Sequence, residues 1–427
     1  MKIGIIGAGF TGLSAGYNLV KDGHQVTIFE KDPHPGGLAI GYQEKGWEWS
    51  LEKHYHHWFT NDESVLRLAK DISYDVLIKR PRTSAYVNGT IYQLDSPLHV
   101  LSFPELPLFD RLRMSAVLAS LRYNPYWQPL ERINASTFLP KVMGEKAYQM
   151  IWEPLLVNKF GSYAGSVSLA WFWARIKKRT ASLAYPKKGF LPFAQAVVAA
   201  IEKQGGKIHF SSEINELKDT AQVHLVVKHG KESTSYTFDR VIVTTPSFLF
   251  LKFALQLPES YKAKLAKLKG LGAINIVLRL KNDFFSDNTY WLSICDKNSP
   301  IMAIVEHTHF MDKKYYNNEH LVYLGNYLPH THRYFTLNKT ELLKEYDQYL
   351  RKINPSYEKS LIGFEMFQAP FAQPVIPVNY SKMLPPFETP LAHVFLANIE
   401  QVYPWDRGTN YAVELGESIA RIITKQS

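Results

Sequence analysis

The 427-residue sequence contains a single cysteine, Cys295. One cysteine cannot form an intramolecular disulfide, and it excludes the C-x-x-C type of metal or redox site. We expect Cys295 to be a small buried residue without a chemical role. No apolar run approaches the ~20 residues that a membrane-spanning helix needs. The first predicted strand starts at the second residue, so we expect no targeting peptide and a cytoplasmic location.

Acidic residues are in the minority, with 39 Asp and Glu against 49 Lys and Arg, a net charge of +10. A basic balance suits nucleic acid, an anionic substrate or an anionic membrane surface, although a merely solvated surface gives it too. The lysines are scattered and no nucleic-acid module is recognisable, so we expect no nucleic-acid partner. The hydrophobic fraction of 46% and aromatic fraction of 14% are typical of a globular enzyme. The length allows two domains, and the sequence does not predict an oligomeric state.

The most informative motif is a glycine-rich turn near the N-terminus, within the residues KIGIIGAGFTG at 2–12. An apolar strand precedes the turn, an amphipathic helix follows it, and a second strand, 25–29, ends at Glu30. In such a unit the glycines allow a tight turn, a close approach to a pyrophosphate and close helix–strand packing, and the acid binds a ribose. The motif predicts a dinucleotide site with the following residues: Gly7, Gly9, Phe10, Thr11, Gly12 and Glu30.

A second glycine pair, Gly36-Gly37, follows Glu30 within the run KDPHPGGL at 31–38. NAD does not need a second loop, whereas FAD is longer and benefits from another close backbone approach. An ordinary Pro-Gly turn is the alternative. The run resembles the loop by which flavoproteins of the amine oxidase, protoporphyrinogen oxidase and phytoene desaturase superfamily hold FAD. The resemblance implies FAD as cofactor and contacts from Lys31, Gly36, Gly37 and Leu38.

Three later segments are similar to the same superfamily. Residues 207–217 resemble the strand and crossover that bring a backbone, here at Ile214, near the adenine. Residues 238–246 resemble a buried strand that returns to the nucleotide domain. In the third segment a strand at 393–398 precedes a terminal helix, whose first amides would face the flavin pyrimidine edge. The resemblance adds these candidate FAD contacts: Asn398, which replaces the usual acid and could bond a phosphate, and Asp406, Arg407, Gly408, Thr409, Asn410 and Tyr411.

The implied fold class is α/β, a Rossmann-like FAD-binding domain interleaved with a second, α+β substrate domain. The FAD-binding domain would comprise residues 1–95, 185–250 and 390–427. The substrate domain would comprise 96–184, mostly helical, and 251–389, which contains an alternating strand at 274–280.

Three histidines lie close together in the segment EKHYHHWF at 52–59. If this segment is a strand, only His54 and His56 share a side, and no further ligand follows at a suitable spacing. We therefore expect no metal site. His54 and His57 are candidate catalytic residues that tune the flavin or carry a proton. Half-buried histidines that pack against aromatic rings are the alternative.

The same region supports a rival activity. Gly7 to Gly37, together with His57, Phe59 and Asn61-Asp62, resembles UDP-galactopyranose mutase, which uses reduced FAD as a nucleophile without net redox change. That resemblance implies arginines for a diphosphate, for which Arg80, Arg82 and Arg175 are candidates.

A departure from the amine oxidases supports a different member of the superfamily. Those enzymes often carry a lysine that bonds a water at flavin N5, and Asn275 stands at that place here. The desaturase-like and protoporphyrinogen oxidase-like members remain, in which oriented hydride removal does most of the work.

Aromatic residues are dense at 152–161 and 171–175, where they form either a core or a cavity wall. Trp152, Lys159 and Arg175 are the candidate substrate contacts. The favoured activity is hydride transfer from a lipophilic or anionic small molecule to flavin N5. The mutase is the alternative, and a flavin-binding protein without redox activity is a third.

Residues 98–130 combine a proline-broken apolar stretch, a predicted helix at 110–123 with interspersed arginines, and interfacial aromatic residues. This composition suits a helix lying in a membrane surface, and related flavoenzymes with lipophilic substrates use this region in that way. A core helix of the substrate domain is the alternative. Membrane contact would place the protein at the inner face of the membrane and predicts salt-sensitive binding to anionic liposomes.

Overall fold

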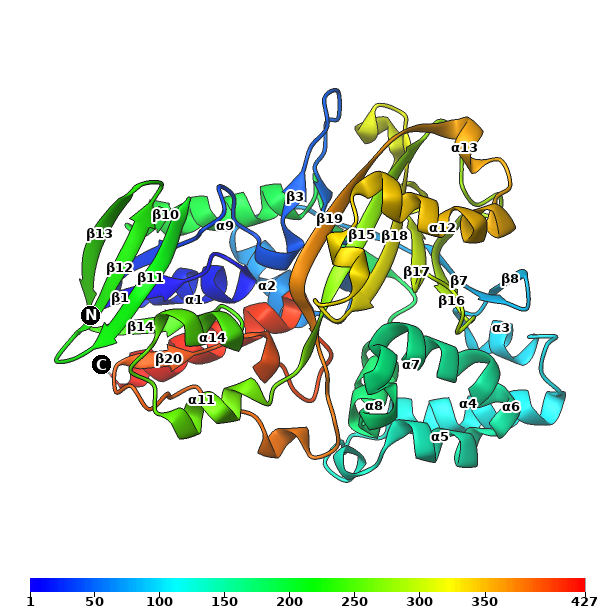
Figure 1. Ribbon diagram of the computed structural model, residues 1–427, viewed down its shortest axis with the longest axis horizontal. Coiled ribbons are helices and arrows are strands. Elements are labelled where there is room, and N and C mark those ends of the chain that lie inside the picture. The colour runs from blue at the N-terminus through cyan, green and yellow to red at the C-terminus, as the bar shows by residue number, and fades with distance from the viewer. Residues whose placement is uncertain (427) are drawn as a thin grey trace.

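The computed structural model describes residues 1–426 in three parts (Figure 1). A parallel sheet with its helices lies at the left of the view and holds both termini. A mixed sheet lies at the upper right, and a group of helices lies below it.

The parallel sheet has the strand order β10-β2-β1-β14-β20. Its strands come from the beginning, middle and end of the sequence, and every pairing in it is parallel. Helices pack against it, so its apolar strands are almost fully buried, as parallel strands usually are. This arrangement confirms the predicted Rossmann-like α/β class. The elements are β1 (Lys2–Ile6), α1 (Phe10–Lys21), β2 (Gln25–Phe29), α9 (Phe190–Lys203), β10 (Lys207–His209), β14 (Arg240–Val243), β20 (Val394–Leu396) and α14 (Thr409–Lys425).

The last helix packs directly on the first. A Cβ atom at Gly416 of α14 would lie 2.4 Å from the Thr11 carbonyl oxygen and 2.8 Å from the Ala15 nitrogen of α1. The Ser14 hydroxyl donates a hydrogen bond of 2.8 Å to the Val413 carbonyl. The contact therefore requires a glycine on α14, and it fixes the start of α14 beside the start of α1.

Three small sheets flank the parallel sheet. An antiparallel sheet, β11-β12-β13, covers one end, and two others surround the segment after the second glycine loop. Their elements are β3 (Gly41–Tyr42), β4 (Leu51–Glu52), β5 (Trp58–Phe59), α2 (Glu63–Asp71), β6 (Val76–Lys79), β9 (Leu183–Pro186), β11 (Ser212–Asp219), β12 (Val223–His229) and β13 (Glu232–Phe238).

The mixed sheet has seven strands in the order β19-β15-β18-β17-β16-β7-β8. Strands β7 and β8 belong to this sheet, because β7 pairs in parallel with β16. The boundary predicted at residue 95 is therefore wrong for 82–93, which lie with the second part of the chain. The elements are β7 (Arg82–Val87), β8 (Thr90–Gln93), β15 (Gly270–Leu280), β16 (Thr289–Ile294), β17 (Ala303–Glu306), β18 (His320–Leu328), α12 (Lys339–Ile353), α13 (Tyr357–Ser360) and β19 (Leu361–Pro374).

The remaining helices form the lower right part of Figure 1 and the connection at 247–266. Within residues 1–426, no helix has the length and apolarity needed to cross a membrane. Cys295 is buried, as predicted, and burial raises the pKa of its thiol to about 12. The helices are α3 (Pro97–Leu101), α4 (Leu108–Tyr123), α5 (Ala135–Met143), α6 (Glu145–Ala147), a π-helical turn (Tyr148–Trp152), α7 (Glu153–Phe160), α8 (Leu169–Lys178), α10 (Ser247–Phe253) and α11 (Glu259–Ala266).

Candidate functional site

The first glycine turn connects β1 to α1 and leaves no room for a side chain at Gly7 or Gly12. Gly7 has a φ of +104°, and a Cβ atom there would lie 2.6 Å from the Thr244 hydroxyl. A Cβ atom at Gly12 would lie 2.0 Å from the Gly7 carbonyl oxygen. Gly9 is the N-cap of α1, which begins with Phe10 and Thr11. The first amides of a helix have no acceptor within it, so this end can bind an anion.

The second glycine loop packs against the first. The Gly36 amide donates to the Ala8 carbonyl at 2.9 Å. A Cβ atom at Gly37, whose φ is +59°, would lie 3.0 Å from the Gly9 Cα atom. Leu38 is partly buried against the core, whereas Lys31 is exposed. The two loops together form one strip of bare backbone next to the N-terminus of α1.

Glu30 lies at the end of β2 beside this strip. Its carboxylate accepts hydrogen bonds from the Ala8 amide at 2.7 Å and the Asp32 amide at 2.9 Å. Burial raises the pKa of Glu30 although both amides act to lower it. Each carboxylate oxygen can accept a second hydrogen bond, which leaves acceptor capacity for a hydroxyl group.

Two other predicted cofactor contacts, Ile214 and Asn398, differ in their burial and surroundings. Ile214 is half-buried in β11, at a point where the register with β12 shifts. Asn398 is fully buried, and its amide donates to the Thr245 carbonyl and to the Ser247 hydroxyl, both at 3.2 Å. The expected phosphate contact of Asn398 is therefore corrected: its side chain is enclosed and holds the turn after β20 to the turn after β14.

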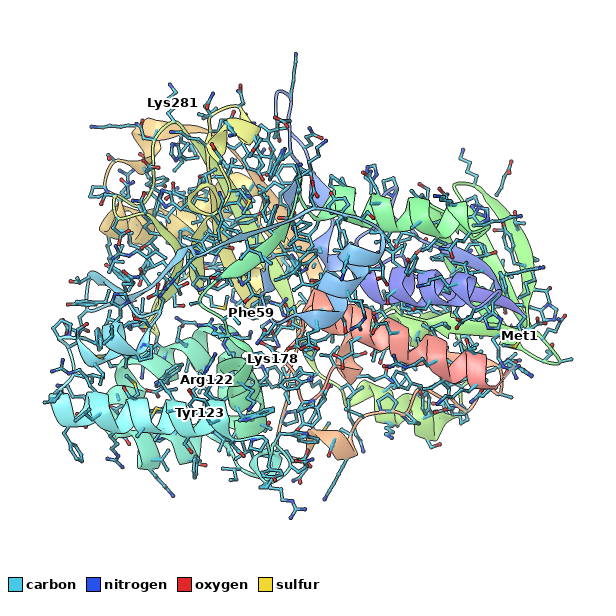
Figure 2. The ribbon with its side chains drawn as sticks, turned by 180° about the vertical axis from the view of Figure 1, so that it is seen from behind. Met1, Phe59, Arg122, Tyr123, Lys178 and Lys281 are labelled. Carbon is cyan, nitrogen blue, oxygen red and sulfur yellow. The ribbon has the colours of Figure 1, made fainter. Side chains whose placement is uncertain are left out.

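A cavity of about 550 Å³ lies where the three parts of the chain meet. Phe59, Arg122 and Lys178, which line it, are labelled in Figure 2. Of the predicted residues, the cavity brings together His57, Trp152, Lys159, Arg175, Asp406, Arg407, Gly408, Thr409 and Tyr411. Its apolar lining includes side chains of α7 and α8, so the aromatic middle segment contributes a cavity wall as well as core.

The start of α14 forms one wall of the cavity. The Trp58 indole donates to the Thr409 hydroxyl at 2.7 Å, and the Val65 amide donates to the Asn410 side-chain oxygen at 3.1 Å. The Tyr411 ring stacks on Trp405 with a centroid separation of 5.9 Å. These contacts hold the helix terminus in place, with Gly408 as its N-cap. The helix that was predicted to begin near residues 409–411 therefore starts at a cavity wall.

The lining of the cavity carries an excess of positive charge. Lys159 and Arg175 lie 3.3 and 3.4 Å from the same Asp406 carboxylate oxygen. Burial acts to raise the pKa of Asp406, but these two cations hold it below its ordinary value. Burial, which outweighs the attraction of Asp406, lowers the pKa of Lys159 well below its ordinary value. The lining contains six basic residues, Arg122, Lys159, Arg175, Lys178, Arg179 and Arg407, and three acids, Asp62, Asp95 and Asp406.

Asp406 and Arg407 were predicted to contact the cofactor, and their side chains are engaged elsewhere. The Asp406 carboxylate also accepts from the Trp171 indole at 3.1 Å and the Gln373 amide at 3.2 Å. The Arg407 guanidinium donates to Gln373 at 2.8 Å and to the Tyr327 hydroxyl. Burial lowers the pKa of Arg407 to about 10. Both side chains thus join α14 to the cavity wall, and only their backbone remains available to a cofactor.

The histidine segment, which we considered as a strand, is not one. Residues 53–57 form an irregular connection between β4 and β5. His56 and His57 line the cavity, and His57 Nδ1 lies 3.0 Å from the Tyr290 hydroxyl. His54 does not line it and instead contacts Asn275 of β15. Burial lowers the pKa of His54 and His57 to about 3 and that of His56 to about 4, so all three are neutral at physiological pH.

Several residues that line the cavity were not predicted from the sequence. Arg122, Lys178, Arg179 and Tyr290 line the cavity, and only the basic run 177–179 after the aromatic helix pointed to any of them. Burial lowers the pKa of Arg179 to about 9. Arg80 and Arg82, two of the predicted diphosphate contacts, do not line the cavity. Arg80 lies beside a separate depression, and Arg82 pairs with Asp287 at 3.0 Å.

Known proteins match this architecture over nearly its whole length. The model of the flavin-containing amine oxidoreductase family matches residues 10–414. A zeta-carotene desaturase from Zea mays is 31% identical over 132 residues, which are 28% of this chain and 23% of the maize protein. The matched region thus spans about a quarter of the length of the maize protein.

Two solved structures share the fold. A protein from Exiguobacterium sp. 255-15, assigned as a protoporphyrinogen oxidase, superposes with a TM-score of 0.76 at 15% identity and covers 100% of this chain and 99% of its own. A reduced UDP-galactopyranose mutase superposes with a TM-score of 0.75 at 14% identity and covers 100% of this chain and 94% of its own. The family match carries a flavin cofactor and oxidoreductase chemistry with it. The chain belongs to the family of flavin-containing amine oxidoreductases.

Proposed function

We propose that this protein is an FAD-dependent oxidoreductase that removes a hydride from an anionic, partly apolar small molecule. The observation that carries the proposal is the cavity, whose lining includes the N-terminus of α14 and more basic than acidic side chains. Leucines of α7 and the aromatic side chains of Trp171 and Phe172 on α8 contribute to the apolar part of the lining. A substrate with a carboxylate or phosphate group and an apolar body fits this combination.

The glycine strip supports FAD as the flavin. Backbone is exposed along both loops because Gly9 and Gly37 face each other without side chains. Such a surface admits a pyrophosphate closely, and the start of α1 would stabilise its negative charge. Glu30 retains acceptor capacity for ribose hydroxyls. FAD bound here would supply hydride acceptance at N5 in the cavity.

The residues of the chain bind and orient more than they transfer protons. His57 and Tyr290 are in contact, and His57 is neutral, so this pair can exchange a hydrogen bond with a substrate without a change in charge. Lys159 and Arg175 share one carboxylate, which leaves positive charge for a substrate anion. Asn275 is buried beside His54, where amine oxidases often carry a lysine. This favours oriented hydride removal of the desaturase type over simple amine oxidation.

A sugar-nucleotide mutase is the second candidate, and the six basic residues at the cavity favour it. A diphosphate carries more charge than a single carboxylate, and arginines bind phosphate groups in a bidentate manner. The shared fold of UDP-galactopyranose mutase is compatible with this candidate.

Spectroscopy of the purified protein separates the two activities. Flavin released from the protein should have the mass of FAD. Under anaerobic conditions, an oxidoreductase substrate should bleach the flavin absorbance near 450 nm. A mutase should leave the spectrum unchanged and convert UDP-galactopyranose only after prior reduction with dithionite. Protein that folds correctly but does not take up FAD would refute both activities.

We further propose that residues 98–130 contact a membrane peripherally, on the inner face if the protein is cytoplasmic. Within residues 1–426, six of the nine exposed large hydrophobic side chains lie in this region: Leu98, Leu108, Phe109, Leu112, Tyr123 and Tyr126. The arginines are less available than the sequence suggested. Arg111 donates to the Leu101 carbonyl at 2.6 Å, and Arg113 donates to the Val142 carbonyl at 2.8 Å. Apolar insertion would thus contribute more than charge, and we expect weaker salt dependence than the sequence implied.

A further inference from the structure

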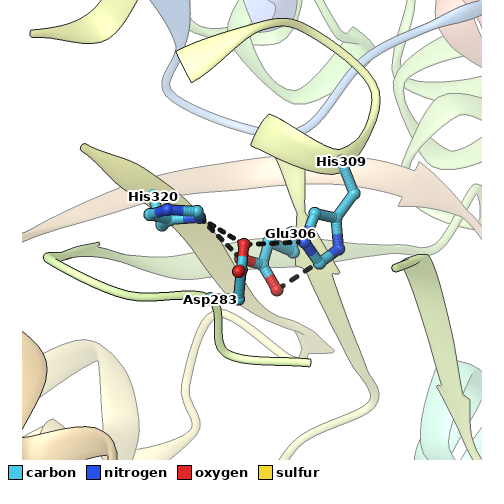
Figure 3. A group of neighbouring side chains, drawn as sticks. All are labelled: Asp283, Glu306, His309 and His320. Atoms are coloured by element: carbon cyan, nitrogen blue, oxygen red, sulfur yellow. Dashed lines mark hydrogen bonds and ion pairs between the residues drawn. The ribbon is translucent and has the colours of Figure 1, made fainter. Parts of the chain in front are cut away.

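Four side chains of the metal-binding types converge at one end of the mixed sheet. They are Asp283 after β15, Glu306 at the end of β17, His309 in the turn His307–His309, and His320 at the start of β18 (Figure 3). One potential ligand atom from each lies within 4.8 Å of all the others. None of the four lines the flavin cavity, and the sequence suggested no link between them because they are brought together only by the sheet.

His309 is oriented as a metal-binding histidine usually is. Its Nδ1 atom donates to the Thr289 carbonyl at 2.9 Å. The lone pair of a neutral ring therefore resides on Nε2, which lies 3.1 Å from Asp283 Oδ1. Metal-bound histidines generally use their second nitrogen in this way, because a carbonyl acceptor fixes both the tautomer and the ring orientation. The side chain is only 7% exposed, so its orientation is also fixed by packing.

His320 supplies an independent sign of a missing partner. Its side chain is 5% exposed, and its Nδ1 atom is buried without a hydrogen-bond partner within residues 1–426. Asp283 Oδ1 lies 2.7 Å away, but not in the direction that a hydrogen bond requires. Glu306 Oε1 lies 3.3 Å from the same nitrogen. A buried ring nitrogen that lies near two carboxylates but makes no hydrogen bond is costly unless another atom binds it.

The charge of the group also calls for a cation. Glu306 is fully buried, and its carboxylate accepts hydrogen bonds from the Phe284 and Phe285 amides at 3.1 and 2.9 Å. These neutral donors do not cancel its charge, and a second carboxylate, Asp283, faces the same histidines. Two carboxylates held together in a partly buried site are stabilised by a positive charge between them.

We propose that Asp283, Glu306, His309 and His320 bind one divalent first-row transition-metal ion. Around a tetrahedral Zn²⁺, with bonds of about 2.0–2.2 Å, neighbouring ligand atoms are about 3.3 Å apart. Three pairs of these atoms are 3.1, 2.7 and 3.3 Å apart, close to this spacing, and the remaining pairs, which lie within 4.8 Å, would close around the ion. Two imidazoles and two carboxylates suit Zn²⁺ or Mn²⁺, whereas Mg²⁺ and Ca²⁺ prefer oxygen ligands alone.

Lys313 would play different roles in a metal site and in a closed cluster, that is, a group of side chains held together by ion pairs alone. Its ammonium lies 2.9 Å from His320 Nε2, and a metal on Nδ1 would leave a proton on Nε2 facing it. Lys313 is exposed and can turn into solvent, so a bound metal would displace it. In a closed cluster, Lys313 and a proton on Nδ1 would instead hold His320 in place. Removing the charge of Lys313 should therefore tighten metal binding if the group is a metal site. If the group is a cluster of ion pairs, the same change should only loosen it.

A bound ion would connect three segments that lead to the flavin cavity. His309 holds the Thr289 carbonyl, and the next residue, Tyr290, contacts His57 in the cavity. The loop that carries Asp283 precedes β16, and Glu306 and His320 lie on neighbouring strands. The ion would thus act as a structural brace and would position Tyr290 from outside the cavity.

The test uses the full chain, stripped with EDTA and equilibrated with Zn²⁺ alone or Mn²⁺ alone. Elemental analysis after dialysis should find one ion per chain, and the protein should unfold about 3 °C or more higher with saturating metal. The variant Asp283→Asn should lose more than ~100-fold in affinity, because Asp283 is half-exposed and its replacement should leave the fold intact. His309→Ala should lose at least as much. Lys313→Met should bind metal about fivefold more tightly because a like charge is removed.

His393→Ala is the matched control, because His393 Nδ1 lies 2.7 Å from a single carboxylate, Asp219, elsewhere in the chain. This variant should bind one ion as the unaltered protein does. The proposal is overturned if the stripped protein takes up no stoichiometric metal at micromolar concentrations. It is equally overturned if Asp283→Asn and His309→Ala retain the ion, or if Lys313→Met does not tighten binding. All of these readouts are independent of flavin content and enzyme activity.

Discussion

The side-chain amide of Asn275 donates a hydrogen bond to His54 Nδ1 and thereby joins the mixed sheet to the histidine segment. Asn275 lies in the middle of β15, is 2% exposed, and its side-chain oxygen is buried without a partner within residues 1–426. His54 is neutral because burial lowers its pKa to about 3, so Nδ1 is free to accept. The contact explains why His54 is turned away from the cavity while His57 faces it.

We expect this contact to be energetically coupled. Replacement of either partner, His54→Ala or Asn275→Ala, should leave the other with an unpaired buried polar atom and lower the free energy of unfolding by ~1–3 kcal/mol. The double variant should lose less than the sum of the two, by about 1 kcal/mol. Urea unfolding of all four proteins measures this coupling. Strict additivity would show that the contact does not contribute.

The glycine strip gives a variant that separates cofactor binding from folding. A Cβ atom at Gly9 would meet only Gly37 Cα at 3.8 Å, an ordinary contact, so Gly9→Ala should fold with nearly unchanged apoprotein stability. The same methyl group would occupy the strip where we place the pyrophosphate, and FAD affinity should fall at least about tenfold. Flavin fluorescence titration measures the affinity.

The control for Gly9→Ala is Gly363→Ala, because no atom lies within 4 Å of a Cβ atom at that position. This variant should change neither the stability of the apoprotein nor its affinity for FAD. If Gly9→Ala binds FAD normally, the pyrophosphate does not lie at this strip.

The predictable parts of this structure are those set by local sequence. The turn at Gly7–Gly12 and the start of α14 at Thr409 follow from short-range geometry, and both lie where the sequence indicated. Strands β7 and β8 were misassigned because the partner of β7 is β16, about two hundred residues later in the sequence. Residues 53–57 were considered as a strand, but no neighbouring strand pairs with them.

The chemistry of the cavity was only partly predictable for a related reason. Lys159 and Arg175 were identified from their aromatic surroundings, but their shared partner Asp406 lies more than two hundred residues away. Nothing local marks Arg122 as a cavity residue, since it reaches the cavity through the packing of α4 against α8. The side-chain amide of Asn398 was expected to face a phosphate, and only tertiary packing shows that it is enclosed.

Stability should depend on pH through Glu52. This residue is fully buried, accepts from the Phe190 amide at 2.9 Å and the Tyr185 hydroxyl, and burial raises its pKa from 4.5 to about 7. Between pH 4.5 and 7 the folded protein therefore holds a proton that the unfolded chain has released. The stabilising contribution of Glu52 protonation to the free energy of unfolding is fully present below pH 4.5. This contribution, up to about 3 kcal/mol, is lost as the pH rises through 7.

The variant Glu52→Gln should remove this part of the pH profile. Urea unfolding at intervals from pH 5 to 8 should show a shallower decline for Glu52→Gln than for the unaltered protein. Glu232→Gln, which changes an exposed acid on β13, should leave the profile as it is. Parallel profiles for Glu52→Gln and the unaltered protein would mean that Glu52 stays ionised in the folded state.

Membrane contact should depend on the exposed apolar residues of α4. Phe109 and Leu112 are 72% and 51% exposed, so Phe109→Glu with Leu112→Glu should preserve folding but reduce co-sedimentation with phosphatidylcholine–phosphatidylglycerol vesicles about tenfold or more. Leu255→Glu is the matched control, because Leu255 is 67% exposed outside this region. Binding of the unaltered protein should largely persist at high salt. Equal loss in the control, or no binding at all, would refute the proposed contact.

We expect Asp406 to stabilise the fold by compensating part of the positive charge around the cavity. Its carboxylate is shared by Lys159 and Arg175, and Asp406→Asn would leave these two charges close together and uncompensated. Loss of one partner of a buried ion pair costs about 3–5 kcal/mol, and we expect a decrease of that order in the free energy of unfolding at pH 7. Adding Lys159→Met to Asp406→Asn should restore part of the stability, because it removes a buried charge that lacks a counter-ion. Urea unfolding of the single and double variants tests the ranking, and a double variant less stable than Asp406→Asn would show that Lys159 stabilises the cavity by packing instead of through its charge.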